Sequence, residues 1–253
     1  MTGRSRVALV VGGASGIGLA VAQRLVADGA FVVVADRDAT ALRSAALRAS
    51  RDGSPIETHV VDVTNEAGVC ALVAGVVDRY GSLDAACNSA GIVGAQQPLV
   101  STELADWRAV LDVDLTGLFL CLREEVRAMT SAGGGSIVNM ASVASFVGSS
   151  GMCAYAAAKH GVLGLTRVAA REAIVSGVRV NAVAPGMTDT PMVQLEMAQS
   201  PEWAARALSA HPIGRAASAD EIAEVVAWLL SPRASYVVGA CVTADGGFTI
   251  GGV

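Results

Sequence analysis

Short apolar runs alternate with longer amphipathic segments along nearly the whole chain. The short runs predict strands at Val7–Val11, Phe31–Ala35, Thr58–Val61, Leu83–Cys87, Ser136–Met140, Val178–Val183 and Ala240–Thr243. The amphipathic segments predict helices at Gly16–Asp28, Ala39–Arg51, Glu66–Tyr80, Glu103–Thr130, Cys153–Ser176 and Ala219–Leu230. This alternation predicts an α/β fold in which a seven-stranded parallel sheet carries helices on both faces. Right-handed crossovers favour a doubly wound strand order, 3-2-1-4-5-6-7.

Composition narrows the class of protein without pointing to a partner. The 253 residues contain no linker, repeat or charge run, so a single domain spanning residues 1–253 is the simplest interpretation. Residues are 53% hydrophobic but only 4% aromatic, which suits helices packed closely on a buried parallel sheet. The net charge of −5 and the absence of a basic patch argue against nucleic acid as a partner.

Cysteine usage and hydropathy favour a cytoplasmic protein. The five cysteines lie far apart without a C-x-x-C pair, and the three histidines lack ligand spacing, so we expect neither a metal site nor a disulfide framework. Residues 128–158 carry no charge and could span a membrane by length. They include five glycines and six serines, which indicates a buried strand followed by an active-site loop instead.

A glycine-rich turn follows the first predicted strand and leads into a helix. Its pattern is G-x-x-x-G-x-G, formed by Gly12, Gly16 and Gly18, with Ser15 and Ile17 between them. Glycines let the backbone approach a pyrophosphate closely, and the helix N-terminus offers free N–H groups to the phosphates. An ordinary strand-to-helix turn is the alternative interpretation of this pattern.

An acidic residue ends the second predicted strand. Asp36 follows Gly18 by 18 residues, and a carboxylate at such a position can accept hydrogen bonds from an adenosine ribose. It would also repel the 2′-phosphate of NADP, at a cost of about 4 kcal/mol for a contact of about 4 Å. Arg37 could weaken this repulsion. We therefore expect NAD to be preferred over NADP. The alternative interpretation is that Asp36 only ends the strand and binds no cofactor.

Three polar side chains suggest acid–base chemistry. Tyr155 and Lys159 are four residues apart and share one face of a predicted helix. A nearby ammonium favours the phenolate, which makes Tyr155 usable as a general acid or base. Ser142 follows the strand Ser136–Met140, at the sheet edge where open α/β folds bind ligands. A lone Y-x-x-x-K pair is common, and it gains meaning only alongside the glycine turn and the acidic strand end.

The chain resembles the short-chain dehydrogenase/reductase family over nearly its whole length. The motifs that carry the resemblance are Gly12-x3-Gly16-Ile17-Gly18, Asp62-Val63, Asn88-Ser-Ala90-Gly91, Ser142, Tyr155-x3-Lys159, Pro185-Gly186 and Asp245-Gly-Gly247. The family implies a single-domain Rossmann fold, a homotetramer, and NAD(P)-dependent hydride transfer to or from a secondary alcohol or ketone. It also implies cofactor contacts from Asp62 and Val63 at the adenine, from Asn88, Ala90 and Gly91 along the cofactor path, from Lys159 at the nicotinamide ribose, and from Pro185, Gly186, Thr188 and Thr190 at the nicotinamide.

Three positions depart from the family pattern. Val11 replaces a usual threonine, and Ser89 replaces a usual asparagine. The third is Asp114, which stands where the family has a fourth catalytic residue, an asparagine that supports a water between the lysine and a proton path. An aspartate there would add charge near Lys159 and raise the apparent pKa for alcohol oxidation. A silent structural role for Asp114 is the alternative.

The preferred hypothesis is an NAD-dependent dehydrogenase or reductase of a small apolar or cyclic alcohol or ketone, without membrane attachment. Asp114 favours a second hypothesis, a nucleotide-binding regulatory homologue with weak turnover. The third, an NADPH-dependent 3-oxoacyl thioester reductase, is disfavoured by Asp36. Segments 211–215 and 244–249 look like those of relatives that act on cyclic diols and ketones. Residues 187–212 form either an apolar lid or the core of two short helices; their apolar members are Met187, Met192, Val193, Leu195, Met197, Trp203 and Leu208.

The resemblance implies that Glu103–Thr130 and Cys153–Ser176 pair across a two-fold axis in the tetramer. The sequence supports this only through apolar stretches such as Leu115–Leu122 and Val162–Leu165. Burial within one chain would produce the same pattern.

Overall fold

A computed structural model describes residues 5–51 and 56–250, and its centre is a seven-stranded parallel sheet. The strand order is β3-β2-β1-β4-β5-β6-β9, which confirms the predicted doubly wound arrangement. The strands are β1 (Val7–Val11), β2 (Phe31–Asp36), β3 (Glu57–Val60), β4 (Ala85–Asn88), β5 (Gly135–Met140), β6 (Val178–Pro185) and β9 (Cys241–Ala244). Every neighbouring pair in this sheet is parallel, so all the carboxyl ends lie at one edge.

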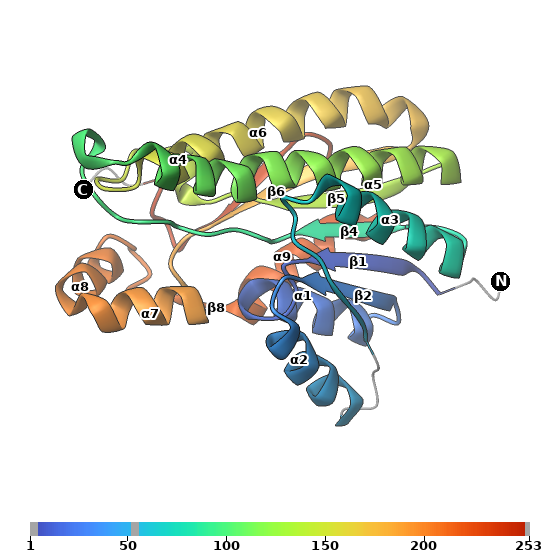
Figure 1. The fold of residues 1–253 in the computed structure, drawn as a ribbon, viewed down its shortest axis with the longest axis horizontal. Coiled ribbons are helices and arrows are strands. Elements are labelled where there is room, and N and C mark those ends of the chain that lie inside the picture. Colours follow the sequence, from blue (N-terminus) through green and yellow to red (C-terminus); the bar gives the residue numbers. More distant parts are fainter. Residues whose placement is uncertain (1–4, 52–55, 251–253) are drawn as a thin grey trace.

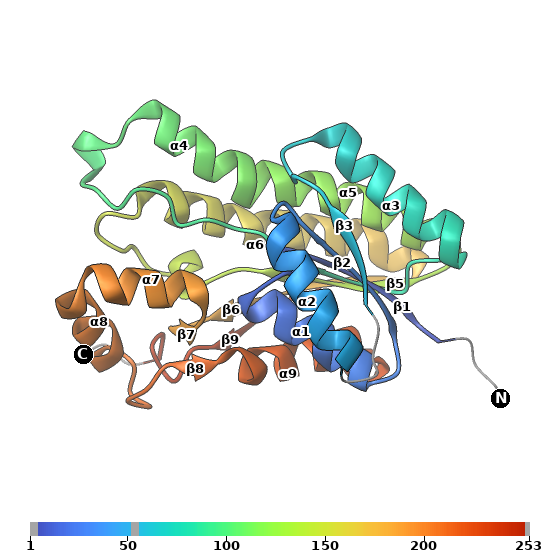
Figure 2. The same ribbon diagram turned by 60° about the horizontal axis from the view of Figure 1, so that its bottom comes forward.

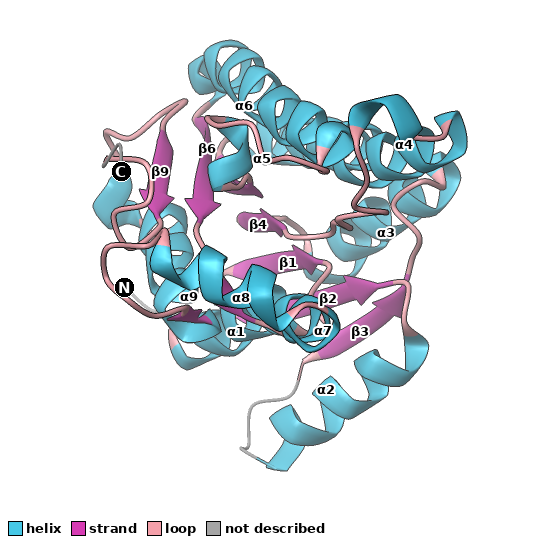
Figure 3. Ribbon diagram, turned by 90° about the vertical axis from the view of Figure 1, so that its left-hand side faces the viewer, coloured by secondary structure: helices cyan, strands magenta, loops and turns pink. Residues whose placement is uncertain are grey.

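Helices cover both faces of the sheet (Figures 1 and 3). One face carries α3 (Glu66–Tyr80), α4 (Leu104–Leu111), α5 (Leu118–Ala132) and α6 (Cys153–Ala173). The other carries α1 (Gly16–Ala27), α2 (Ala39–Arg51) and α9 (Ala219–Leu230). Two further helices, α7 (Pro191–Gln199) and α8 (Pro201–Ser209), lie beyond the carboxyl ends of the strands (Figure 2).

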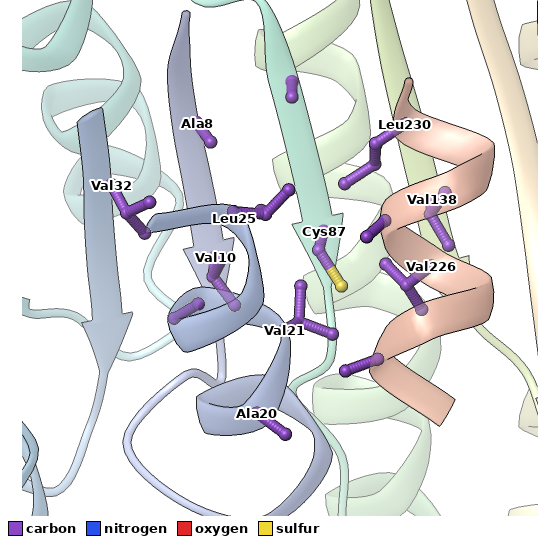
Figure 4. Close-up of a cluster of buried hydrophobic side chains, with 14 of the residues drawn as sticks. Ala8, Val10, Ala20, Val21, Leu25, Val32, Cys87, Val138, Val226 and Leu230 are labelled. Carbon is purple, nitrogen blue, oxygen red and sulfur yellow. The ribbon is translucent and has the colours of Figure 1, made fainter. Parts of the chain in front are cut away.

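The continuous apolar run of the first strand follows from its burial on both faces. Val7, Leu9 and Val11 pack into the core beneath α3 and α5. Ala8 and Val10 point the other way and pack against α1 and α9, as Figure 4 shows. All five are at most 2% exposed, which explains why every position of β1 is apolar.

The long helical region predicted at Glu103–Thr130 is interrupted. A π-helical segment, Asp112–Gly117, separates α4 from α5, and it contains Asp114. At Gly117 a Cβ would lie 2.6 Å from a methyl carbon of Val63, so the segment packs too closely there for a side chain. π-Helical turns occur often at functional sites. Apolar periodicity could not show this one, because the pattern continues on both sides of it.

A second, two-stranded sheet was not predicted. It pairs β7 (Thr188–Asp189) with β8 (Ala217–Ser218), and each strand is too short to show alternation. The predicted lid at 187–212 begins with β7 and holds α7 and α8. The charge-free stretch forms β5, a 3₁₀ turn at Val143–Ser145 and the start of α6, as interpreted from the sequence. None of the helices in the described ranges is long and apolar enough to cross a membrane.

Candidate active site

A cleft of about 310 Å³ opens at the carboxyl ends of the strands. Its walls bring together residues from most of the predicted motifs. Those that line it are Gly12, Ser15, Gly16, Ile17, Asp36, Arg37, Asp62, Val63, Ala90, Gly91, Ser142, Tyr155, Lys159, Pro185, Gly186, Thr188 and Thr190. Three predicted site residues, Gly18, Asn88 and Asp114, lie behind the wall instead.

The glycine turn is packed closely against neighbouring backbone, because two of its positions admit no side chain. Gly12 has φ +74°, and a Cβ there would lie 2.4 Å from the backbone nitrogen of Ala90. A Cβ at Gly18 would lie 2.2 Å from the carbonyl oxygen of Gly12. Ser15 precedes α1, and its side chain caps no backbone N–H group of that helix. Ser15, Gly16 and Ile17 line the cleft at the start of α1, so the N-terminal N–H groups of this helix can bind a pyrophosphate.

Two carboxylates stand at the strand ends beside this turn. Asp36 accepts hydrogen bonds from the backbone nitrogens of Ala14, at 3.2 Å, and Asp38, at 3.1 Å. Each carboxylate oxygen has a second lone pair, so ribose hydroxyls can still bind. Asp62 accepts from the backbone and the hydroxyl of Thr64, and these hydrogen bonds lower the pKa of Asp62. Both groups therefore suit the nucleoside end of a dinucleotide.

Lys159 is held rigidly beside Tyr155. Its ammonium lies 5.4 Å from the centre of the tyrosine ring and donates to the carbonyl oxygen of Met140 at 3.1 Å. Only 4% of Lys159 is exposed. Burial alone would lower its pKa, but the charges of Asp114 and Tyr155 raise it by more, so the pKa of Lys159 lies above its usual value. The lysine therefore stays a cation beside the phenol.

Asp114 lies directly behind the lysine. Its Oδ2 is 3.2 Å from the Lys159 Nζ, and its Oδ1 accepts from the backbone nitrogen of Ile92 at 2.8 Å. Burial raises the pKa of Asp114, and Lys159 and the Ile92 N–H oppose that rise. The expectation that this carboxylate sits next to the lysine agrees with the geometry. Its effect on catalysis stays a prediction.

The loop that carries Ser142 is tied to the helix that carries the tyrosine. Ser142 begins a 3₁₀ turn, and its hydroxyl accepts from the backbone nitrogen of Ala144 at 3.2 Å. Ser145 donates to the carbonyl oxygen of Lys159 at 2.7 Å and accepts from the Ser142 N–H at 3.3 Å. The sequence analysis did not single out Ser145. An S-x-x-S pattern after a strand is the signal that could have revealed it.

Asn88 faces the core and does not line the cleft, although the resemblance placed it on the cofactor path. Its Nδ2 donates to Glu125 at 2.8 Å and to Asn139 at 3.1 Å. Asn139 in turn donates to Thr166 at 3.0 Å. This chain of side chains links the end of β4 to α5, β5 and α6, so Asn88 supports the backbone of Ser89–Gly91 from behind. Burial raises the pKa of Glu125 to about 7.

The remaining part of the cleft is apolar. Beside Ser142 and Tyr155 it is lined by side chains that the sequence analysis did not assign to the site or gave only to the lid, namely Ile92, Met140, Ala141, Met192 and Val193. Charged lining residues in the described ranges are Asp36, Arg37 and Asp62 at the glycine-turn end, and Lys159. The substrate end therefore offers a hydroxyl, a phenol and hydrocarbon.

Comparisons with known proteins agree with this geometry. A family model described as enoyl-(acyl carrier protein) reductase matches residues 12–249. The chain is 45% identical over 251 residues to cis-4-hydroxycyclohexanecarboxylate dehydrogenase of Sinomonas cyclohexanicum, covering 96% of each chain. It is 45% identical to 2,5-dichloro-2,5-cyclohexadiene-1,4-diol dehydrogenase of Sphingobium indicum over 95% of this chain and 96% of that protein. The crystal structure of levodione reductase superposes with a TM-score of 0.92 at 41% identity, covering 98% of this chain and 100% of the other.

A glycine turn, a buried lysine beside a tyrosine and a strand-end serine on a doubly wound sheet define a nicotinamide-dependent oxidoreductase. The chain belongs to the short-chain dehydrogenase/reductase family, whose members act on CH–OH groups and the corresponding carbonyls.

Proposed function

We propose that the protein is an NAD-dependent dehydrogenase that interconverts an uncharged cyclic secondary alcohol and its ketone. The observation that carries this proposal is the apolar end of the cleft around Ser142 and Tyr155. The nicotinamide, when bound, supplies the hydride acceptor or donor. The turn fits such a cofactor, because Gly12, Ser15 and Gly16 line the cleft where α1 begins.

The side chains would divide the remaining chemistry among them. Ser142 would hold the substrate oxygen with its hydroxyl, since this residue lines the cleft together with Tyr155. Tyr155 would take the proton from the alcohol during oxidation and return it during reduction. The Lys159 ammonium would stabilise the phenolate that accepts this proton in oxidation and remains after it is donated in reduction, because the ammonium is held 5.4 Å from the ring. The loop and helix would keep these groups aligned through Ser145.

The cofactor preference rests on Asp36. A carboxylate there accepts from ribose hydroxyls but repels a 2′-phosphate. We expect kcat/KM to be at least about tenfold higher with NAD than with NADP, which needs only about 1.4 kcal/mol. Measuring both cofactors with one alcohol tests this, with Asp36→Asn as the matched variant that should narrow the ratio. Equal use of both cofactors by the wild type would contradict the assignment and would indicate that Arg37 dominates.

The substrate class rests on the charges at the apolar end of the cleft. The cation that the described residues place there, Lys159, is already paired with Asp114 at 3.2 Å. Two relatives named above carry a cyclohexane or cyclohexadiene ring in their substrate names, which supports a ring alcohol. We expect cyclohexanol to be oxidised with a kcat/KM at least about tenfold above that of cis-4-hydroxycyclohexanecarboxylate, since burying an unpaired carboxylate costs several kcal/mol. A preference for the carboxylate would refute the uncharged class.

The assembly proposed from the family is a homotetramer. The apolar stretches quoted for it are largely buried within the chain, including Leu118, Leu120, Val162 and Leu163, so they add no support. Exposed Phe119 on α5 and Val168 on α6 are the better candidates for a subunit contact. A monomeric mass in light scattering at micromolar concentration would refute the proposal. We also propose a single domain and a cytoplasmic location, in keeping with five free cysteines.

A further inference from the structure

A histidine outside the cleft is hydrogen-bonded at both ring nitrogens. His211 follows α8 and is only 6% exposed. Its Nδ1 lies 2.7 Å from the carbonyl oxygen of Ala207, and its Nε2 lies 3.0 Å from the backbone nitrogen of Met187. A carbonyl oxygen can only accept and a backbone N–H can only donate. The ring is therefore neutral, with its hydrogen on Nδ1 and its lone pair aimed at the Met187 N–H.

The two partners belong to different parts of the molecule. Met187 lies in the turn after β6, where its neighbours Gly186 and Thr188 line the cleft. Ala207 lies in α8, the second helix of the lid. The ring is packed against the back of the turn, because a Cβ at Gly186 would lie 2.8 Å from Nε2. His211 thus connects the lid to the rear of the cleft wall.

The start of the lid, at Met187, is hydrogen-bonded to the chain where it leaves α8. The Met187 N–H donates to His211, and the Met187 carbonyl oxygen accepts from the Ala217 N–H at 2.9 Å. Both backbone groups of Met187 are therefore bonded to the chain after α8, one to His211 and the other to Ala217. The neighbouring Gly186 N–H donates separately to the Ala244 carbonyl at 3.0 Å. Losing the His211 bond would loosen the turn without releasing it from the sheet.

We infer that His211 is a positioning residue whose Nε2 fixes the turn at Gly186–Thr188. Through this turn, it fixes the position of the nicotinamide beside Tyr155. The inference rests on the proposed NAD site. Hydride transfer is sensitive to such placement, because a misplacement of about 1 Å can cost about 10²-fold in rate. The acceptor atom, rather than the bulk of the ring, is the feature that matters.

Three substitutions of His211 distinguish the effect of losing the hydrogen-bond acceptor from the effect of losing the ring. In His211→Gln the amide oxygen can reach the Met187 N–H in place of Nε2. His211→Asn is shorter, so it can reach Ala207 but not Met187, and His211→Leu offers no acceptor at all. We expect the Gln variant to stay within about threefold of wild type. The Asn and Leu variants should bind NADH about tenfold more weakly and lose about tenfold or more in kcat, with the alcohol KM nearly unchanged.

NADH binding is followed by the fluorescence of the reduced nicotinamide, which needs no alcohol. Phe248→Leu serves as the control, because Phe248 packs 4.9 Å from the His211 ring without touching its hydrogen bonds. Wild-type NADH binding in the Asn variant, or equal losses in the Gln, Asn and Phe248→Leu variants, would overturn the inference. Failure of the wild type to oxidise any alcohol would instead contradict the proposed function, and the NADH comparison would still decide the role of His211.

Discussion

Glu125 supplies the clearest link between burial and stability. Its side chain extends from α5 to Asn88 at the end of β4 and is fully buried, and this burial raises the pKa of the carboxyl from the ordinary 4.5 to about 7. An acid with a raised pKa in the folded state destabilises the fold once the pH exceeds its unfolded value. The loss begins near pH 4.5, grows as the pH rises to about 7, and then stays constant. The difference between the folded and unfolded pKa values corresponds to a loss of about 3 kcal/mol in the free energy of unfolding.

Glu125→Gln removes this ionisation and keeps the shape of the side chain. The amide oxygen can still accept from the Asn88 Nδ2, now 2.8 Å from the carboxylate. We expect the stability of the variant relative to wild type to increase by about 2–3 kcal/mol between pH 5 and pH 8. Any packing difference that does not depend on pH cancels in this comparison. Urea unfolding followed by tryptophan fluorescence at both pH values measures it.

The adjacent Glu124 provides a matched control. Burial alone would raise its pKa, but hydrogen bonds from Arg123 and Arg127 outweigh that effect and lower it. Glu124 is therefore ionised in both states above pH 5, and Glu124→Gln should show a stability difference that does not change between pH 5 and pH 8. A stability difference for Glu125→Gln that is equally independent of pH would refute the reasoning.

Two further predictions concern the cleft. Gly18→Ala should weaken NADH binding by more than about tenfold, because its Cβ would lie 2.2 Å from the Gly12 carbonyl oxygen; a fluorescence titration that matches wild type would contradict this role of the glycine turn. Asp114→Asn should lower the apparent pKa of the alcohol-oxidation rate, because the carboxylate 3.2 Å from the Lys159 Nζ offsets the charge that favours the Tyr155 phenolate. Superimposable pH–rate profiles at saturating NAD would leave Asp114 with a structural role only.

The sheet could be predicted because the burial of its strands is visible in the sequence as short runs of apolar residues. Val7–Val11 is apolar at every position, as a strand covered on both faces must be, and the structure gives the same bounds. Strand ends then locate polar residues such as Asp36 and Ser142 at the edge where the cleft forms. Those residues do line it.

Other features depend on contacts between distant residues, which periodicity does not encode. The π-helical turn at Asp112–Gly117 leaves the apolar pattern unbroken, so a continuous helix was predicted. Asn88 ends β4 as Asp36 ends β2, yet its side chain turns inward, where Glu125, 37 residues away, offers an acceptor. His211 is hydrogen-bonded to Met187, 24 residues earlier, because α7 and α8 bring the chain back to the turn after β6.

The most direct test of the account is the rate of Tyr155→Phe. The change removes the hydroxyl that would carry the proton and keeps the ring beside Lys159. We expect kcat for alcohol oxidation to fall by about 10²–10⁴-fold, the usual contribution of general acid–base catalysis, while NADH binding stays within about threefold of wild type. A Phe variant that keeps more than about a tenth of the wild-type rate would contradict the claim that Tyr155 transfers the proton.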